Sequence, residues 1–142
     1  MNFDTAVAAQ EAFRRAQSTG ELGEDLESAI EAEERFASST GQNSTDAYDT
    51  LLKIGDEHLK ATAFLEFLIY TTWNYVMELP SPDRFKQGLE LCNRYLKEAV
   101  GKTDKTRIAQ IQELRHSFLN GLGRTDDEGV EEYDEDAFAG GD

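Results

Sequence analysis

The stretch from Leu59 to Leu79, LKATAFLEFLIYTTWNYVMEL, constrains the fold more than any other part of this chain. It holds the only Trp, two of the eight Phe and two of the five Tyr. On an ideal helix its large apolar residues form two neighbouring stripes, which together cover well over half of the circumference. A helix of this kind must be covered on most sides, so this stretch is predicted to be the central buried helix.

A membrane span is the other structure that a long apolar stretch predicts, and the composition argues against it. Glu66, Asn74 and Glu78 lie inside the stretch, and a charged side chain costs about 2.5 to 3.5 kcal/mol near the centre of a membrane helix. The N-terminus lacks the basic start and apolar run of a secretory signal. The single cysteine, Cys92, has no partner for an intramolecular disulfide and is predicted to be a small core residue. We therefore expect no membrane segment and a cytoplasmic location.

Apolar residues before this stretch recur at spacings of three and four, which predicts two amphipathic helices. The first helix runs from Phe3 to about Ser18 and stops at Gly20. The second lies between Gly20 and Gly41, and Gly41 closes it. One carboxylate, Glu33, falls on the otherwise apolar face of the second helix.

A polar connection from Gln42 to Asp46 is predicted to lead into the next helix. The side chain that caps the free amides of that helix would be Ser44, Thr45 or Asp46. The helix then either breaks at Gly55 or continues to Leu79. Good helix formers after Gly55 and the absence of Pro favour continuity, although glycine costs about 1 kcal/mol relative to alanine inside a helix.

Pro80-Ser81-Pro82 predicts a sharp corner, with Ser81 as the N-cap and Pro82 as the first residue of the following helix. That helix carries an apolar face from Phe85 to Val100. A final amphipathic helix is predicted to begin at a cap formed by Thr103 or Asp104 and to stop at Gly121 and Gly123.

These segments together predict an all-α fold with one helical domain over residues 1–123. Five or six amphipathic helices would form either an array of helical hairpins, as in a repeat protein, or an irregular bundle. Residues 124–142 carry nine acids and one base. They show no helical stripe, so they are predicted to form a disordered acidic tail. Val130, Tyr133 and Phe138 interrupt the acids, which leaves a docking motif as the alternative to a purely solvating tail.

Two segments share a pattern that is also found in helical repeats, while an irregular bundle that uses small residues at close helix crossings stays the alternative. Ser28 to Phe36, SAIEAEERF, and Gln87 to Tyr95, QGLELCNRY, have a small residue second, an aliphatic third, Glu fourth, Arg eighth and an aromatic ninth. Around Ala29 and Gly88, both segments resemble the second helix of a tetratricopeptide-type repeat, whose small residue packs closely on the first helix of its hairpin. The resemblance implies a scaffold or chaperone with a concave peptide-binding surface and implies no catalysis.

The net charge of −15 bears on the choice of partner. Affinity for nucleic acid depends on neutralising phosphates, so an acidic chain is not expected to bind it, and a partner with a basic surface is favoured. Residues 81–123 reverse the balance with eight bases and five acids. A second hypothesis is that these residues form a basic face onto which the acidic tail docks until a partner displaces it. The face would comprise Arg84, Lys86, Arg94, Lys97, Lys102, Lys105 and Arg107.

These features predict a non-enzymatic protein-binding module, of the adaptor, chaperone or regulatory-subunit kind, that needs no cofactor or metal. The central helix has more apolar surface than one layer of neighbours easily covers, so a partner protein or a second copy of the chain is the alternative to cover by its own helices. The predicted partner-binding residues are aromatic: Phe64, Phe67, Tyr70, Trp73, Tyr133 and Phe138.

A helical metalloprotein or enzyme is the alternative function, built on Glu66, Glu113 and His116. Glu113 and His116 have the Glu-x-x-His spacing that puts a carboxylate and an imidazole on one helical face. A carboxylate-bridged metal site needs a second copy of this motif. The other histidine, His58, has Gly55 at the matching position, so the second copy is absent.

Overall fold

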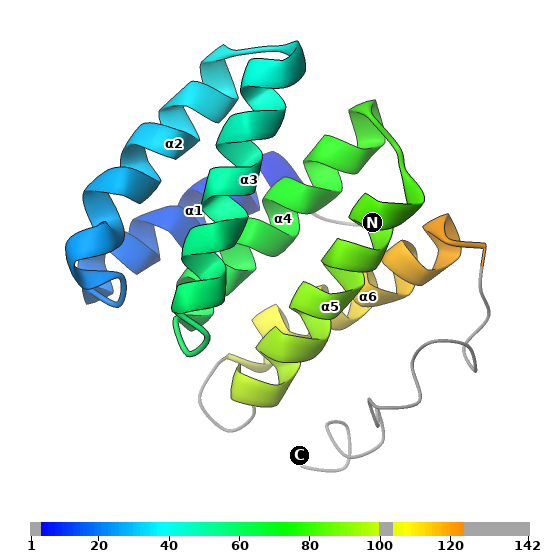
Figure 1. The fold of residues 1–142 in the computed structure, drawn as a ribbon. Helices are drawn as coiled ribbons and strands as arrows, with labels where there is room; N and C mark the ends of the chain where they lie inside the picture. Colours follow the sequence, from blue (N-terminus) through cyan, green and yellow to red (C-terminus); the bar gives the residue numbers. More distant parts are fainter. Residues whose placement is uncertain (1–3, 100–103, 124–142) are drawn as a thin grey trace.

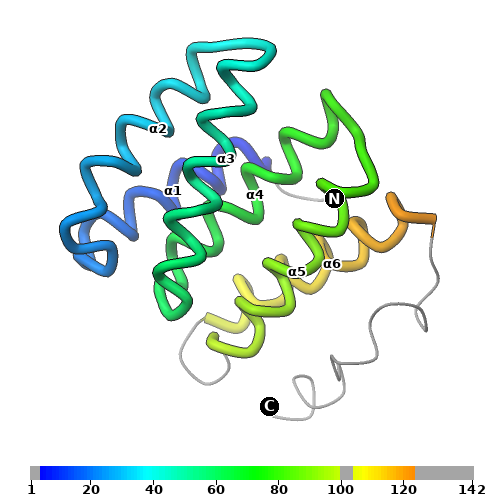
Figure 2. The backbone as a smooth tube through the Cα atoms, viewed as in Figure 1, coloured from blue at the N-terminus to red at the C-terminus, as the bar shows by residue number. Residues whose placement is uncertain are grey.

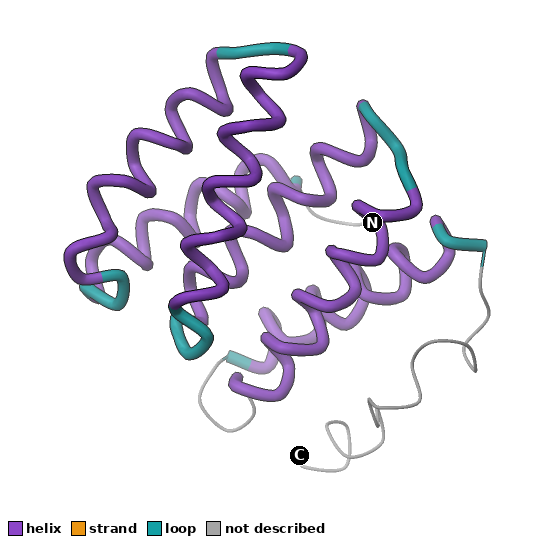
Figure 3. Tube along the Cα trace, in the orientation of Figure 1, coloured by secondary structure: helices purple, strands orange, loops and turns teal. Residues whose placement is uncertain are grey.

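The computed structural model of the protein describes residues 4–99 and 104–123. This part of the chain folds into six α-helices and one 3-10 turn and contains no strand (Figures 1 and 3), which confirms the all-α prediction. In chain order the elements are α1 (Thr5–Thr19), η1 (Gly23–Asp25), α2 (Leu26–Ser38), α3 (Gly41–Glu57), α4 (Thr62–Glu78), α5 (Pro82–Ala99) and α6 (Lys105–Gly121).

Helix α4 lies at the centre, packed mainly against α1 and α5 and also in contact with α3 and α6 (Figure 2). Every residue from Ala63 to Thr72 is buried. Burying one large apolar side chain contributes about 1.5 to 3 kcal/mol, so this run supplies much of the driving force for folding. The prediction of a central buried helix is confirmed, and the cover comes from the other helices of the same chain.

Helices α2 and α3 form one antiparallel hairpin, and α5 and α6 form another, whereas α1 packs on α4. In the second hairpin, a glycine on each helix receives a phenylalanine ring from the other. A Cβ atom on Gly88 would lie 2.2 Å from Cε1 of Phe118, and one on Gly121 would lie 2.2 Å from Cε1 of Phe85. These two close approaches require glycine and fix how α5 lies on α6.

The prediction of an unbroken helix from about Thr45 to Leu79 is wrong. Helix α3 ends at Glu57 and α4 begins at Thr62, while Gly55 lies buried inside α3. A hydrogen bond from a distant part of the chain stabilises the connection between the two helices. It joins Nε2 of His58 and Oδ2 of Asp25 at 2.7 Å.

The same distant segment caps α4. The residue at the N-cap position of α4, Ala61, offers no side-chain hydrogen bond, although the first amides of a helix have no partner within it. Glu21 supplies the bond, since its Oε1 accepts from the backbone N–H of Phe64 at 2.8 Å. The α1–α2 connection therefore stabilises both sides of the break between α3 and α4.

The predicted boundary near Gly41 is also wrong. Gln42 to Asp46 form the first turn of α3 rather than a polar connection, and Thr40 is the N-cap residue. A hydrogen bond of 2.8 Å from Nε2 of Gln42 to Oδ1 of Asp46 spans this turn. The helical turn also carries Thr45, whose Oγ1 lies 2.8 Å from the hydroxyl of Tyr75 on α4.

Other predicted boundaries are confirmed. Oγ of Ser81 accepts from the backbone N–H of Arg84, and Pro82 begins α5. Oδ1 of Asp104 accepts from the N–H of Thr106 at the start of α6. Gly20 ends α1 with a φ of 69°. The predicted acidic tail lies outside the described residues, and no helix within them is both long and apolar enough to cross a membrane.

Replacing Glu21 with Ala tests the cap that this residue provides to α4. The backbone N–H of Phe64 then loses its acceptor, and loss of a helix cap costs about 1 kcal/mol. We expect the urea midpoint of unfolding to fall accordingly. Glu24→Ala removes the same charge from an exposed position of the same connection and is the matched control. Equal midpoints for the two variants would show that the cap contributes nothing.

Candidate functional site

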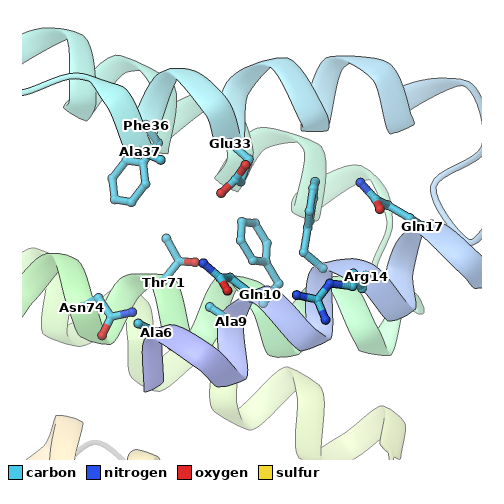
Figure 4. A pocket seen from close by; sticks show the side chains of 12 residues that line it. Ala6, Ala9, Gln10, Arg14, Gln17, Glu33, Phe36, Ala37, Thr71 and Asn74 are labelled. Carbon is cyan, nitrogen blue, oxygen red and sulfur yellow. The ribbon is translucent and has the colours of Figure 1, made fainter. Parts of the chain in front are cut away.

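A hollow lies between α1 and α2, with side chains of α4 at its base (Figure 4). It forms because α1 packs on α4 whereas α2 packs chiefly on α3. Its volume is about 440 Å³. Helix α1 contributes Ala6, Ala9, Gln10, Phe13, Arg14 and Gln17, α2 contributes Glu33, Phe36 and Ala37, and α4 contributes Phe67, Thr71 and Asn74.

Small residues keep this hollow open, and aromatic residues line its base. Ala6 and Ala9 on α1 face Ala37 on α2 (Figure 4), where larger side chains would fill the space. At the base, the rings of Phe13 and Phe67 lie 4.7 Å apart between centroids. The hollow therefore offers an apolar base between two separate helical walls.

A second hollow of about 610 Å³ extends the first past the C-terminal end of α2. The two hollows share Phe36, Ala37 and Asn74 in their linings, so they adjoin each other. The second is also lined by Tyr75, Glu78 and Leu79 of the α4 end, and by the α2–α3 turn, and Leu79 is 52% exposed. We call the two hollows together the α1–α2 groove.

Glu33 is the acidic side chain of the first hollow. It points from α2 toward the α1 wall (Figure 4) and is half-buried, with no hydrogen-bond or ion-pair partner among the described residues. Burial, together with the neighbouring charge of Glu34, raises the pKa of Glu33. A partly desolvated carboxylate without a partner attracts a cationic or hydrogen-bond-donating group.

Three of the aromatic residues predicted to bind a partner lie in the interior instead. Phe64, Phe67 and Tyr70 are at most 3% exposed, because α4 is covered by the helices of its own chain. Phe67 still reaches the base of the groove. Trp73 is half-buried, with its ring edge-on to Phe118 at 5.3 Å between centroids. The other two predicted residues, Tyr133 and Phe138, lie outside the described residues.

The predicted basic face is partly neutralised by acids of the central helices. Arg84 pairs with Asp49 at 3.1 Å and lies over the ring of Tyr48, and Arg94 pairs with Asp56 at 3.3 Å. Nε of Arg107 lies 3.5 Å from Oε1 of Glu66. Lys86 and Lys97 on α5 and Lys105 on α6 are exposed, and Lys102 lies outside the described residues. The arginines of this set are therefore engaged in holding helices together.

Glu66 is a buried polar residue that connects several helices of the fold. Its Oε2 accepts from Nη2 of Arg15 at 2.6 Å, and its Oε1 accepts from the hydroxyl of Tyr95 at 2.7 Å. With Arg107 nearby, the carboxylate joins α1, α4, α5 and α6. Burial raises the pKa of Glu66, and it outweighs the lowering effects of Tyr95, Arg15 and Arg107.

The residues proposed for a metalloprotein or enzyme do not come together. Glu113 and His116 are exposed on α6, whereas Glu66 is 2% exposed. Within residues 4–99 and 104–123, no three His, Cys, Asp or Glu side chains are grouped so that they could hold a metal ion. Cys92 is fully buried among apolar side chains, and burial raises the pKa of its thiol. The prediction that Cys92 is a core residue is confirmed.

The sequence predicted the inward position of Glu33 but not the groove around it. A carboxylate on an otherwise apolar helix face was the available signal, because a charge at such a position needs a partner or an opening to water. The α1 wall gave no signal, since Gln10 and Gln17 are ordinary residues for the polar side of a helix. They line the groove only because α2 packs on α3 and not on α1.

Comparison with protein families, curated proteins and solved structures found no match. The resemblance to tetratricopeptide-type repeats therefore stays a prediction. One fold can host many functions, so the groove bears more directly on function than the fold does.

The pH dependence of stability tests the environment of Glu66. Burial raises the pKa of Glu66 above its ordinary value of 4.5, so the folded state holds a proton at a pH where the unfolded chain has released it. The resulting stabilisation is complete below the unfolded pKa and is lost as pH rises through the folded pKa. We expect the free energy of unfolding of the wild type, relative to Glu66→Gln, to increase as pH falls from 7 toward 4.5.

Urea unfolding at a series of pH values measures this difference. Glu113→Gln is the control, because it removes the same charge from an exposed position of α6. If the two variants depart from the wild type with the same pH profile, burial of Glu66 is not the cause.

Proposed function

We propose that this chain is a non-enzymatic protein-binding module that docks a segment of a partner protein in the α1–α2 groove. The observation that carries the proposal is the α1–α2 groove, with Phe13, Phe36 and Phe67 along it. On one wall it has the carboxylate of Glu33, which has no partner among the described residues. Binding sites typically combine an apolar base with a few polar groups that fix the orientation of the ligand.

The dimensions of the groove suit a peptide segment. From Ala6 to Gln17, the α1 wall extends for roughly 16 Å along the helix axis, and the second hollow continues beyond it to Leu79. An extended chain covers roughly 3.3 Å per residue, so about five residues would occupy the first hollow alone. Exposed Leu79 at the far end offers a further apolar contact. A groove of this length and composition favours an adaptor, chaperone or regulatory role.

Substitution of Ala37 with Trp tests this proposal by filling the groove from its wall. Ala37 is exposed and borders both hollows, so the large side chain blocks the site without entering the core. Ala109→Trp is the matched control, because Ala109 is an exposed alanine on α6. Peptides selected from a random display library against the full wild-type chain serve as probes.

We expect Ala37→Trp to weaken the selected peptides by at least about tenfold, which is 1.4 kcal/mol, and Ala109→Trp to leave their affinity unchanged. Ala6→Trp, introduced at an exposed position of the α1 wall, should reproduce the loss from the other side. Circular dichroism establishes that each variant remains folded. Peptides that bind all three variants as they bind the wild type would rule out the groove as the docking site.

A further inference from the structure

We propose that the occupant of the α1–α2 groove is an extended peptide segment that places a lysine or arginine against Glu33. This inference rests on the proposed function and specifies the chemistry of the partner. It is carried by the charge around the groove, by the position of Glu33, and by the amide side chains of the α1 wall.

The charge around the groove favours a basic occupant. Glu11 on α1 and Glu27, Glu31 and Glu34 on α2 are exposed, and only Glu31 among them has an ion-pair partner in the described part of the chain. Two of the three arginines of α1 and α2 are engaged, Arg15 with Glu66 and Arg35 with Glu31. Acidic surfaces of this kind raise the local concentration of cationic segments.

Glu33 is the point at which such a segment would be anchored. Its carboxylate is half-buried and unpaired among the described residues, whereas Glu34 beside it in sequence is exposed. A cation that reaches Glu33 is shielded from water by the walls, so its attraction is stronger than at an exposed acid. Arg14 is the only base among the described residues that line the groove, and it forms no ion pair with Glu33. Arg14 therefore favours a polar or acidic residue in the part of the bound peptide that lies next to it.

The α1 wall favours an extended occupant over a helical one. Gln10 and Gln17 are seven residues apart, roughly 10 Å along the helix axis, which matches the rise of three extended residues. Each side-chain amide both donates and accepts, and neither is engaged by another described residue. An extended backbone presents free N–H and C=O groups to such amides, whereas the middle of a helix presents none.

The positions of the contacts set the sequence that would be recognised. Phe36 and Ala37 lie about one helical turn after Glu33, roughly 5 Å along α2. In an extended segment, side chains that face the same way are two residues apart, at roughly 7 Å. A basic residue at Glu33 should therefore have an apolar residue two positions away, directed at Phe36.

Charge reversal at Glu33 tests the inference. A random peptide display library is selected separately against the full-length wild type, Glu33→Lys and Glu34→Lys. We expect the wild type and Glu34→Lys to select Lys or Arg at one fixed position with an apolar residue two positions away. Glu33→Lys should instead select Asp or Glu at that position. The two variants have equal net charge, so a difference between them reports the place of the charge.

Affinity gives a second, quantitative readout. For a peptide selected on the wild type, Glu33→Gln should weaken binding by about tenfold, whereas Glu34→Gln should change it less than twofold. The loss at Glu33 should persist at moderate salt because the pair is partly buried.

The possible outcomes separate this inference from the proposed function. One outcome is that Ala37→Trp blocks the selected peptides, but these peptides lack a preferred basic position, or Glu33→Lys selects the same sequences as the wild type. This outcome overturns the inference and leaves the groove as the docking site. Apolar residues selected at spacings of three and four indicate a helical occupant and overturn the extended geometry. Peptides that Ala37→Trp does not block, or the absence of any selected peptide, overturn both.

Discussion

Helix α4 has almost no polar side, and the rest of the fold follows from the need to cover it. From Ala63 to Thr72 every side chain is buried, and α1, α3, α5 and α6 all contact this helix. Glu66, Tyr70 and Thr72 in this run bond to side chains of these same neighbours. Thr72 lies 2.6 Å from the hydroxyl of Tyr48 on α3, and Glu66 binds side chains of α1 and α5. The polar bonds fix how each covering helix is placed, whereas the apolar area supplies the driving force.

The groove is a consequence of the same packing. Helix α1 packs on α4, which begins 43 residues after α1 ends. Helix α2 packs on α3 instead, and the ring of Phe36 lies 6.0 Å from the ring of Tyr48 between centroids. Two helices adjacent in sequence thus become the opposite walls of a groove. The alanines that face each other across it leave the space unfilled.

Local patterns predicted the helices, and the errors arose where distant contacts decided the outcome. The Pro80-Ser81-Pro82 corner and the Asp104 cap depend on neighbouring residues alone, so the sequence was sufficient. The break at His58 depends on Asp25 and Glu21, which nothing near His58 reveals. The same holds for the binding residues. The sequence does not show which helices cover Phe64 and Tyr70, so both were predicted to bind a partner. Gln10 and Gln17 line the groove only because α2 packs on α3 and not on α1.

Glu33 links the packing to the proposed function. An aliphatic residue at this position would extend the apolar lining of the groove and stabilise the free protein, because burial of apolar area is favourable and a partly buried carboxylate is costly. The chain instead holds a carboxylate whose pKa is raised by that burial. Under the proposed function, a cation or a hydrogen-bond donor that enters the groove removes this cost, which then contributes to the binding free energy. The carboxylate at this position is therefore explained better by the proposed docking of a cationic group than by packing in the free protein.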